Sequence, residues 1–410
     1  MKHEWTFRSR FRRHAFGWRS QPAIQRIKEA VSEIKKTARK DSVLGAEGAV
    51  LFLEKLSPAI EQVDGSSGAV GTAVNHAIEA LVPIIARAQA EDKLRDKWLE
   101  RLCEAVEDDK MPYIELLTDY WGELCATQEC SSRWADRFIG TLRLVWNRAP
   151  GQRLFFKWTS ACLSALLKAG RNEEIIELLE LAPFKFWHER KWGVKALTAL
   201  GRKAEAIRFA EDSRGSNDNS VAIAQACEEI LLASGMAEEA YNRYAIEANR
   251  KSTYLATFRS IAGKYPNKQP ADILNDLVAG TPGEEGKWFA AAKSVGLYDE
   301  AIELANRTPC DPRTLTRAAR DMAETEPLFA VEAGMAALRW LVEGYGYEIS
   351  DLDVRSAYEF TMTAAKNAGC EHETFERIRN LVASEVPGER FVNMVLGREL
   401  GLSNNEGENR

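Results

Sequence analysis

A recurring spacing of glycine and glutamate constrains the fold of this chain most strongly. In the C-terminal part of the sequence, five glycines each follow an apolar stretch with helical periodicity, and a glutamate stands four positions after each one. The glycines are Gly170, Gly201, Gly235, Gly296 and Gly369, and the matching glutamates are Glu174, Glu205, Glu239, Glu300 and Glu373. The first two intervals between the glycines are 31 and 34 residues, and the later intervals of 61 and 73 residues have room for two units each.

The physical basis of this spacing is the turn of a helical hairpin. Glycine adopts the left-handed conformation that ends one helix, and glutamate in the first turn of the next helix complements its macrodipole. Because one hairpin cannot bury its apolar face alone, several hairpins must stack on one another. The two long intervals predict further helix pairs without a marker glycine, around residues 266–270 and 312–345.

The earlier part of the chain also has helical periodicity. Ser20 and Pro22 fit the start of a helix whose apolar residues follow i, i+3, i+4, i+7 spacing. A second helix is predicted to end near Ser57 and Pro58, and further helices are predicted over residues 70–82 and about 91–107, 112–128 and 131–147. No segment alternates with period two, so we predict an all-α fold.

We expect four segments along the chain. Residues 1–20 form a basic aromatic arm, and residues 21–150 form an N-terminal α-helical domain. Residues 151–400 form an α-solenoid of antiparallel helix pairs, and residues 401–410 form a disordered tail.

The turn sequences resemble those of the tetratricopeptide repeat superfamily. The clearest match is residues 296–302 (GLYDEAI), followed by residues 235–241 and 201–207. The resemblance covers about residues 152–386 and implies a tetratricopeptide-like α-solenoid of about seven helix pairs, which binds a protein partner in its groove. The first 90 residues resemble uncharacterised bacterial helical proteins through residues 16–20 and 63–68, a resemblance that implies no activity.

The formal net charge of −6 is the sum of two regions of opposite sign. Residues 1–40 contain 12 Lys and Arg against three Glu, or +9, and the remaining residues carry −15. The residues of the arm that interleave cations and aromatic rings are Trp5, Arg8, Arg10, Arg12, Arg13, Trp18 and Arg19. Three interpretations stay open: the arm packs on its own body, it contacts nucleic acid, or it inserts into a protein partner.

A cationic groove is a second candidate site. In a tetratricopeptide-like hairpin the first helix lines the concave face, and projection from Gly170 and Gly201 places these residues there: Lys157, Ser160, Ser164, Lys168, His188, Lys191 and Lys195. Such a groove suits an acidic or carboxylate-bearing peptide, and the alternative is a solvated face that binds nothing in particular. Trp187 and Trp192 are either core residues or exposed anchors for the partner.

No motif in the sequence indicates catalysis, a metal site or a cofactor. Cys125 and Cys130, and likewise Cys370 and His372, lack the second pair of ligands that zinc requires. The glycine-rich stretch 65–72 lacks the Gly-Lys-Ser/Thr ending of a phosphate-binding loop. Seven scattered cysteines are typical of a reducing compartment, and no uncharged apolar run reaches about 18 residues. We expect a cytoplasmic protein without cofactor or membrane contact.

The sequence therefore predicts a non-enzymatic scaffold or adaptor whose partner is a protein. The alternative is a subunit of a nucleic-acid-directed complex, such as a phage-defence or mobile-element assembly, in which the basic residues 1–40 contact nucleic acid.

Overall fold

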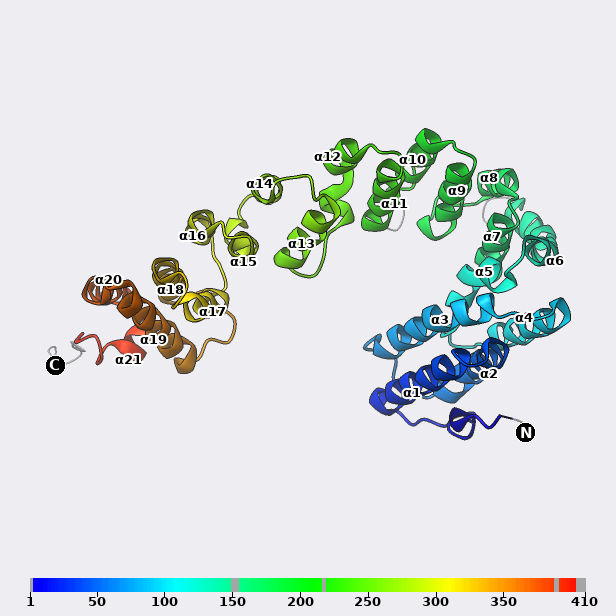
Figure 1. Cartoon of the computed structure of the whole chain (residues 1–410), viewed down its shortest axis with the longest axis horizontal. Helices are drawn as coiled ribbons and strands as arrows, with labels where there is room; N and C mark the ends of the chain where they lie inside the picture. The colour runs from blue at the N-terminus through cyan, green and yellow to red at the C-terminus, as the bar shows by residue number, and fades with distance from the viewer. Residues whose placement is uncertain (1–2, 149–154, 216–218, 387–390, 403–410) are drawn as a thin grey trace. The chain divides into compact units, whose positions relative to one another are not determined.

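The computed structural model describes residues 3–148, 155–215, 219–386 and 391–402. These residues form α-helices and three short 3-10 helices without any β-strand, which confirms the predicted all-α class (Figure 1). The chain divides into two compact units, Met1–Ile230 and Leu231–Arg410. The domain boundary expected at residue 150 lies inside the first unit, because the helices on either side of it, α6 and α7, pack together. The expected tail at 401–410 falls outside the described residues from 403 onward.

Three long helices that all contact one another open the first unit. They are α1 (Ser20–Ala38), α2 (Ser42–Ile60) and α3 (Ala69–Arg87). The helices that follow are α4 (Asp92–Glu107), η2 (Glu115–Tyr120), α5 (Trp121–Cys125), α6 (Gln128–Trp146), α7 (Thr159–Lys168), α8 (Asn172–Leu181), α9 (Trp187–Ala199), α10 (Lys203–Glu211) and α11 (Ser220–Leu232). One apolar face of each long helix is buried in a shared core, as the predicted periodicity requires.

Two predicted boundaries in this unit are wrong. Helix α2 does not end at Pro58 but continues to Ile60, since Ala59 and Ile60 are fully buried and their packing offsets the backbone hydrogen bond that proline cannot donate. The single helix expected over residues 112–128 is η2 followed by the short α5. Helix α5 ends there because Ala126 adopts a positive φ of 63°, which turns the chain before α6 begins.

The N-terminal arm packs on the body of the first unit. Trp5, Phe7 and Phe11 are 6%, 2% and 1% exposed, and the rings of Phe7 and Phe11 lie 5.5 and 4.9 Å from that of Phe52 on α2. Residues Thr6–Ser9 form the 3-10 helix η1 against α1. The arm thus adopts the first of the three arrangements considered from the sequence, while its remaining side chains point to solvent: Arg8, Arg10, Arg12, Arg13, Trp18 and Arg19.

The predicted glycine turns are present in the structure. The five marker glycines have φ values between 72° and 77°. In each turn the amide of the residue after the glycine bonds a carbonyl five residues back, as from Arg171 to Leu166 and from Leu297 to Ala292. This is the hydrogen-bond pattern that closes a helix around a left-handed glycine. The structure confirms the predicted turns. They could be predicted from the sequence because each turn depends only on neighbouring residues.

The second unit continues with paired helices. They are α12 (Ala237–Ala248), α13 (Tyr254–Lys264), α14 (Pro270–Ala279), η3 (Glu285–Trp288), α15 (Phe289–Ser294), α16 (Tyr298–Arg307), α17 (Pro312–Met322), α18 (Pro327–Val342), α19 (Asp351–Ala368), α20 (Glu371–Ala383) and α21 (Phe391–Leu396). The two pairs predicted without a marker glycine correspond to α13–α14 and α17–α18, whose members pack on each other.

Among the described residues, one helix is long and apolar enough to cross a membrane, judged only by its length and composition. This helix is α3, and its residues Val74, Ile78 and Leu81 are fully buried in the core of the first unit. A core helix of a folded protein passes the same test, and the burial of these residues is that of a core helix.

The buried arm leads to a prediction about stability. Phe11→Ala removes a ring that is 1% exposed and is expected to lower the free energy of unfolding by about 3–5 kcal/mol, because a cavity remains in the core. The matched control is Trp18→Ala, which removes a ring that is 72% exposed and should change stability by less than about 0.5 kcal/mol. Urea denaturation followed by circular dichroism measures both, and equal effects would show that the arm is not part of the core.

A second prediction concerns the close packing of α18 on α19. A Cβ at Gly334 would clash with the side chain of Thr361, which is itself fully buried, so Gly334→Ala is expected to destabilise the second unit by about 1–3 kcal/mol. Gly140 also lies within a helix, but nothing approaches its Cβ position within 4 Å. Gly140→Ala should therefore stabilise the chain by about 0.5–1 kcal/mol. Thermal unfolding of both variants tests the opposite signs.

Candidate binding groove between α1 and α3

The residues predicted to line the solenoid groove lie on or beside α7 and α9, and several of them are already engaged. Lys157 donates a hydrogen bond to the carbonyl of Val106, and the Lys191 ammonium lies 2.5 Å from the carboxylate of Asp119. Ser164 is buried and bonds the backbone of Asp119 and Gly122, since η2 and α5 pack on α7. Three predicted residues remain exposed, Lys168, His188 and Lys195, and Ser160 is half-buried. The expected open groove is therefore covered along α7.

The two tryptophans predicted as possible anchors are core residues. Trp187 is 9% exposed and Trp192 is 4% exposed. Helix α9 contacts α7, α8 and α10, so its aromatic residues are covered by neighbouring helices and have no exposed face for a partner. The ammonium groups of Lys191 and Lys195 lie 5.2 and 4.7 Å from the centre of the Trp192 ring, in cation–π contact.

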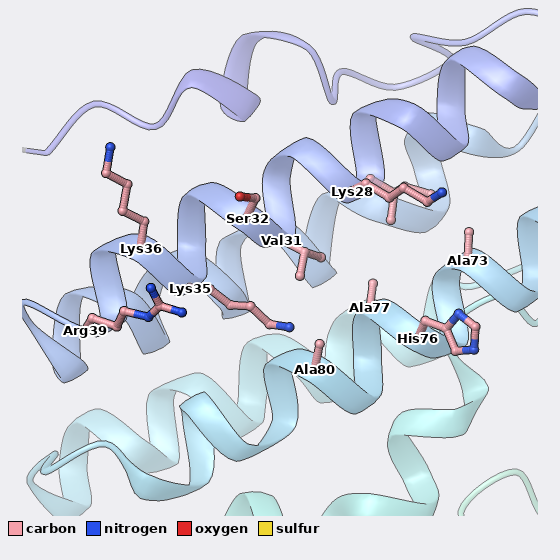
Figure 2. Close-up of a pocket in the computed structure, with 11 residues that line it drawn as sticks. Lys28, Val31, Ser32, Lys35, Lys36, Arg39, Ala73, His76, Ala77 and Ala80 are labelled. Carbon is pink, nitrogen blue, oxygen red and sulfur yellow. The ribbon is translucent and has the colours of Figure 1, made fainter.

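A groove that the sequence did not predict runs between α1 and α3. Its wider part has a volume of about 670 Å³ and lies between Lys28–Arg39 and Ala73–Ala80, and its narrower part, about 310 Å³, extends to Ser42 and Arg87 (Figure 2). The two parts share Lys35, Arg39 and Ala80, so they form one continuous channel. We call this channel the basic groove. The residues that line it are Ile27, Lys28, Val31, Ser32, Lys35, Lys36, Ala38, Arg39, Ser42, Ala73, His76, Ala77, Ala80, Pro83, Ile84 and Arg87.

The floor of the basic groove is apolar and its small side chains leave it hollow. Ala73, Ala77 and Ala80 follow one another at i, i+4 and i+7 on α3, so they share the face that looks toward α1. Val31 on α1 and Ile84 on α3 are half-buried and line the same channel. Alanine side chains end at Cβ, and no larger side chain fills the space above them.

The rim of the groove is cationic. Lys28, Lys35 and Arg39 stand at i, i+7 and i+11 on α1 and therefore lie along one side of that helix. Lys36 and Arg87 add two further charges. All five side chains are exposed, and none has an ion-pair or hydrogen-bond partner within the described parts of the chain. The lining residues include no carboxylate.

The carboxylates of α1 are held on its other side by the arm. Glu33 accepts hydrogen bonds of 2.8 Å from both the amide and the hydroxyl of Thr6, and Glu29 pairs with Arg10 at 2.8 Å and Arg26 at 2.6 Å. In Figure 2 the ribbon of the arm runs along the side of α1 that faces away from α3. Among the residues that the structure describes, no acid therefore forms an ion pair with the rim cations.

A hollow in the second unit has a different charge balance. It has a volume of about 410 Å³ and is lined by residues of α17 and α19. There Arg313 pairs with Asp353 at 2.7 Å, and Arg320 pairs with Asp321 at 2.7 Å. The Arg313 guanidinium holds the pKa of Asp353 well below its usual range. Because acids are already paired with these arginines, this hollow attracts anions less than the basic groove does.

Among the residues that line the basic groove, His76 is the only imidazole, and the lining contains no carboxylate or thiol that could form a catalytic pair with it. Across the described residues, no group of three or more His, Cys, Asp or Glu is placed to hold a metal ion. The excess of +9 in residues 1–40 was visible in the sequence, and a helical wheel of residues 28–39 would have revealed the cationic stripe. The pairing of α1 with α3 was not visible.

A buried carboxylate beside the two tryptophans leads to a pH prediction. Burial raises the pKa of Glu189 to about 7, and its Oε2 atom has no hydrogen-bond partner. Because the pKa of Glu189 is higher in the folded state than in the unfolded state, protonation of this carboxyl favours folding. This contribution to stability is fully present below about pH 4.5 and is lost as the pH rises through about 7. Glu189→Gln should therefore stabilise the protein at pH 8, by up to about 3 kcal/mol, and have little effect at pH 4.5.

The control for this pH profile is Glu177→Gln, which changes an exposed glutamate of α8. Denaturation curves at several pH values measure the difference between each variant and the wild type. A difference for Glu189→Gln that does not change between pH 4.5 and 8 would contradict the prediction.

Comparison of the chain with protein-family models, curated proteins and solved structures found no match.

Proposed function

We propose that this chain is a non-enzymatic helical scaffold that binds a protein partner, and that an acidic segment of the partner docks in the basic groove. The observation that carries this proposal is the row of five unpaired cations beside an apolar floor. Cations that no acid of the described residues neutralises attract an anionic ligand, and the floor adds apolar contact. The docking site thus lies between α1 and α3, and not in the solenoid groove predicted from the sequence.

The energies of ion pairing and of apolar burial favour a ligand that contacts both the cationic rim and the apolar floor of the groove. An exposed ion pair contributes only about 0.2–1 kcal/mol, so five such pairs alone give weak, salt-sensitive binding. Apolar burial contributes about 25 cal/mol per Å², so covering a few hundred Å² of the floor adds several kcal/mol. The charges then steer the encounter and select an acidic partner, while the floor supplies much of the affinity.

Nucleic acid is the second candidate, supported by the exposed arginines of the arm together with the α1 cations. Arg8, Arg12, Arg13 and Arg19 have no ion-pair partner among the described residues. However, nucleic-acid grooves combine cations with aromatic platforms for base stacking. The lining of the basic groove contains no Phe, Tyr or Trp, and an apolar floor makes no favourable contact with phosphates. This lining favours a protein ligand.

The scaffold itself is proposed to be a tetratricopeptide-like repeat. Its support is the packed helix pairs within each unit, such as α7–α8 and α9–α10 in the first and α13–α14 and α17–α18 in the second, together with the five closing turns with left-handed glycine. A stack of such pairs provides extended surface for partners, as an adaptor requires.

The experiment compares two charge reversals of equal size. Lys28→Glu/Lys35→Glu removes two cations from the groove, and Lys93→Glu/Lys97→Glu changes two exposed lysines of α4 outside it. The probe is a fluorescein-labelled, 18-residue peptide of glutamate, leucine and alanine, measured by anisotropy at increasing NaCl concentrations. The groove variant is expected to lose about tenfold or more in affinity and the control about twofold or less.

Two outcomes would overturn this proposal. One is equal peptide affinity in the wild type and the groove variant. The other is the absence of peptide binding while a 20-nucleotide single-stranded RNA binds the wild type and not the groove variant, which would support the nucleic-acid alternative. Thermal unfolding of each variant checks that the fold is retained.

A further inference from the structure

We infer that the occupant of the basic groove is an acidic, amphipathic α-helix of the partner that lies antiparallel to α1 and α3, with its N-terminus beside Arg39 and Arg87. This inference rests on the proposed function and adds the conformation, the direction and the charge pattern of the ligand. Four features of the groove support it: its length, its lack of backbone partners, its small-residue floor and the position of its cations.

The length of the groove matches a short helix. The lining residues run from Ile27 to Ala38 along α1, with Arg39 and Ser42 just beyond its end, and from Ala73 to Arg87 along α3. The span along α3 is 14 steps between residues, or about 21 Å at 1.5 Å per step. A ligand helix of about 14 residues covers this distance. The N-terminal parts of α1 and α3 line the same end of the channel, so the two helices run in the same direction.

The groove offers few partners for an extended peptide. An extended chain carries a free N–H and C=O at each residue, and these groups need hydrogen bonds when they are removed from water. Between the rim cations, the uncharged polar side chains that line the channel are Ser32, Ser42 and His76. A helix satisfies its backbone internally and presents only side chains, so it fits an apolar floor at lower cost.

The floor allows a helix to approach closely. Ala73, Ala77 and Ala80 form a ridge of small residues along α3, and helices pack at axial distances of about 8–10 Å when the side chains at the contact permit it. Each of the helices α1, α2 and α3 contacts the other two. Since α1 and α3 run in the same direction, a fourth helix antiparallel to both would complete an up-down-up-down arrangement, the common topology of four-helix bundles.

The cations set the direction of the ligand. Lys35, Lys36 and Arg39 gather toward the C-terminal end of α1, and Arg87 is at the C-terminal end of α3. A helix N-terminus is stabilised by acidic residues in its first turn. In the antiparallel orientation, the acidic first turns of the ligand meet these cations. The partial positive charge of its N-terminus also lies beside the negative ends of α1 and α3.

The test uses three labelled 18-residue peptides of identical composition. The first is an amphipathic helix with apolar residues at i, i+3, i+4 and i+7 and glutamates in its first two turns. The second has the same sequence reversed, which keeps the apolar face but moves the glutamates to the last turns. The third is a scrambled sequence without a periodic apolar face. Anisotropy gives the affinities and circular dichroism gives the helicity gained on binding.

The first peptide is expected to bind full-length protein about tenfold or more tighter than the scrambled peptide and to gain helicity on binding. A benzophenone at its N-terminus should cross-link to residues 35–42 or 83–87, as mapped by mass spectrometry. Ala80→Trp, which fills the middle of the channel without changing its charge, should abolish this preference. Ala86→Trp, at a half-buried position of α3 outside the lining, is the matched control.

The failures of the two proposals are distinguishable. If the scrambled peptide binds as tightly as the first one, without gain of helicity, the helix inference is wrong and acidic docking stands. Cross-links near Lys28 and Ala73, or tighter binding of the reversed peptide, overturn the antiparallel direction. If no peptide binds and the wild type instead sediments with phosphatidylserine vesicles, both the proposed function and this inference are wrong.

Discussion

The contact between the Glu33 carboxylate and residues Thr6 and Phe7 organises the N-terminal part of this protein. Glu33 accepts hydrogen bonds from both backbone amides and from the Thr6 hydroxyl, and so fixes η1 against α1. With η1 held there, the Phe7 and Phe11 rings reach Phe52 and complete the core of the first three helices. The arm is thereby part of the folded unit.

The same contact determines which charged side chains of α1 are paired with an opposite charge. Arg10 and Arg26 use the Glu29 carboxylate, so the arm occupies both acids of α1 on one side of that helix. Elsewhere in the first unit Arg101, Arg137 and Arg171 each pair with acidic residues. The cations of the basic groove lack such partners within the described residues, and like charges at i, i+4 destabilise a helix by about 0.2–0.5 kcal/mol per pair. Binding an acidic ligand relieves this repulsion, which gives the basic groove a physical reason to bind one.

The structure also shows which kinds of prediction succeed. The five glycine turns and the paired helices around them were predicted because each depends on a few neighbouring residues. The helix expected over 112–128 and the end expected at Pro58 failed, since packing against other helices decided both. The surroundings of the predicted groove residues were decided in the same way: Lys191 pairs with Asp119, 72 positions away, and neighbouring helices cover Trp192. No local pattern encodes those contacts.

The sequence by itself determined that this chain is helical, where its hairpins close and that its first 40 residues are strongly basic. These properties follow from backbone conformation, helical periodicity and composition, which are local. Only the tertiary structure decided which of the basic residues face an acid and which face an open channel. That division arises because the arm and α3 lie on different sides of α1, so one side is neutralised and the other is left with cations above a floor of alanines.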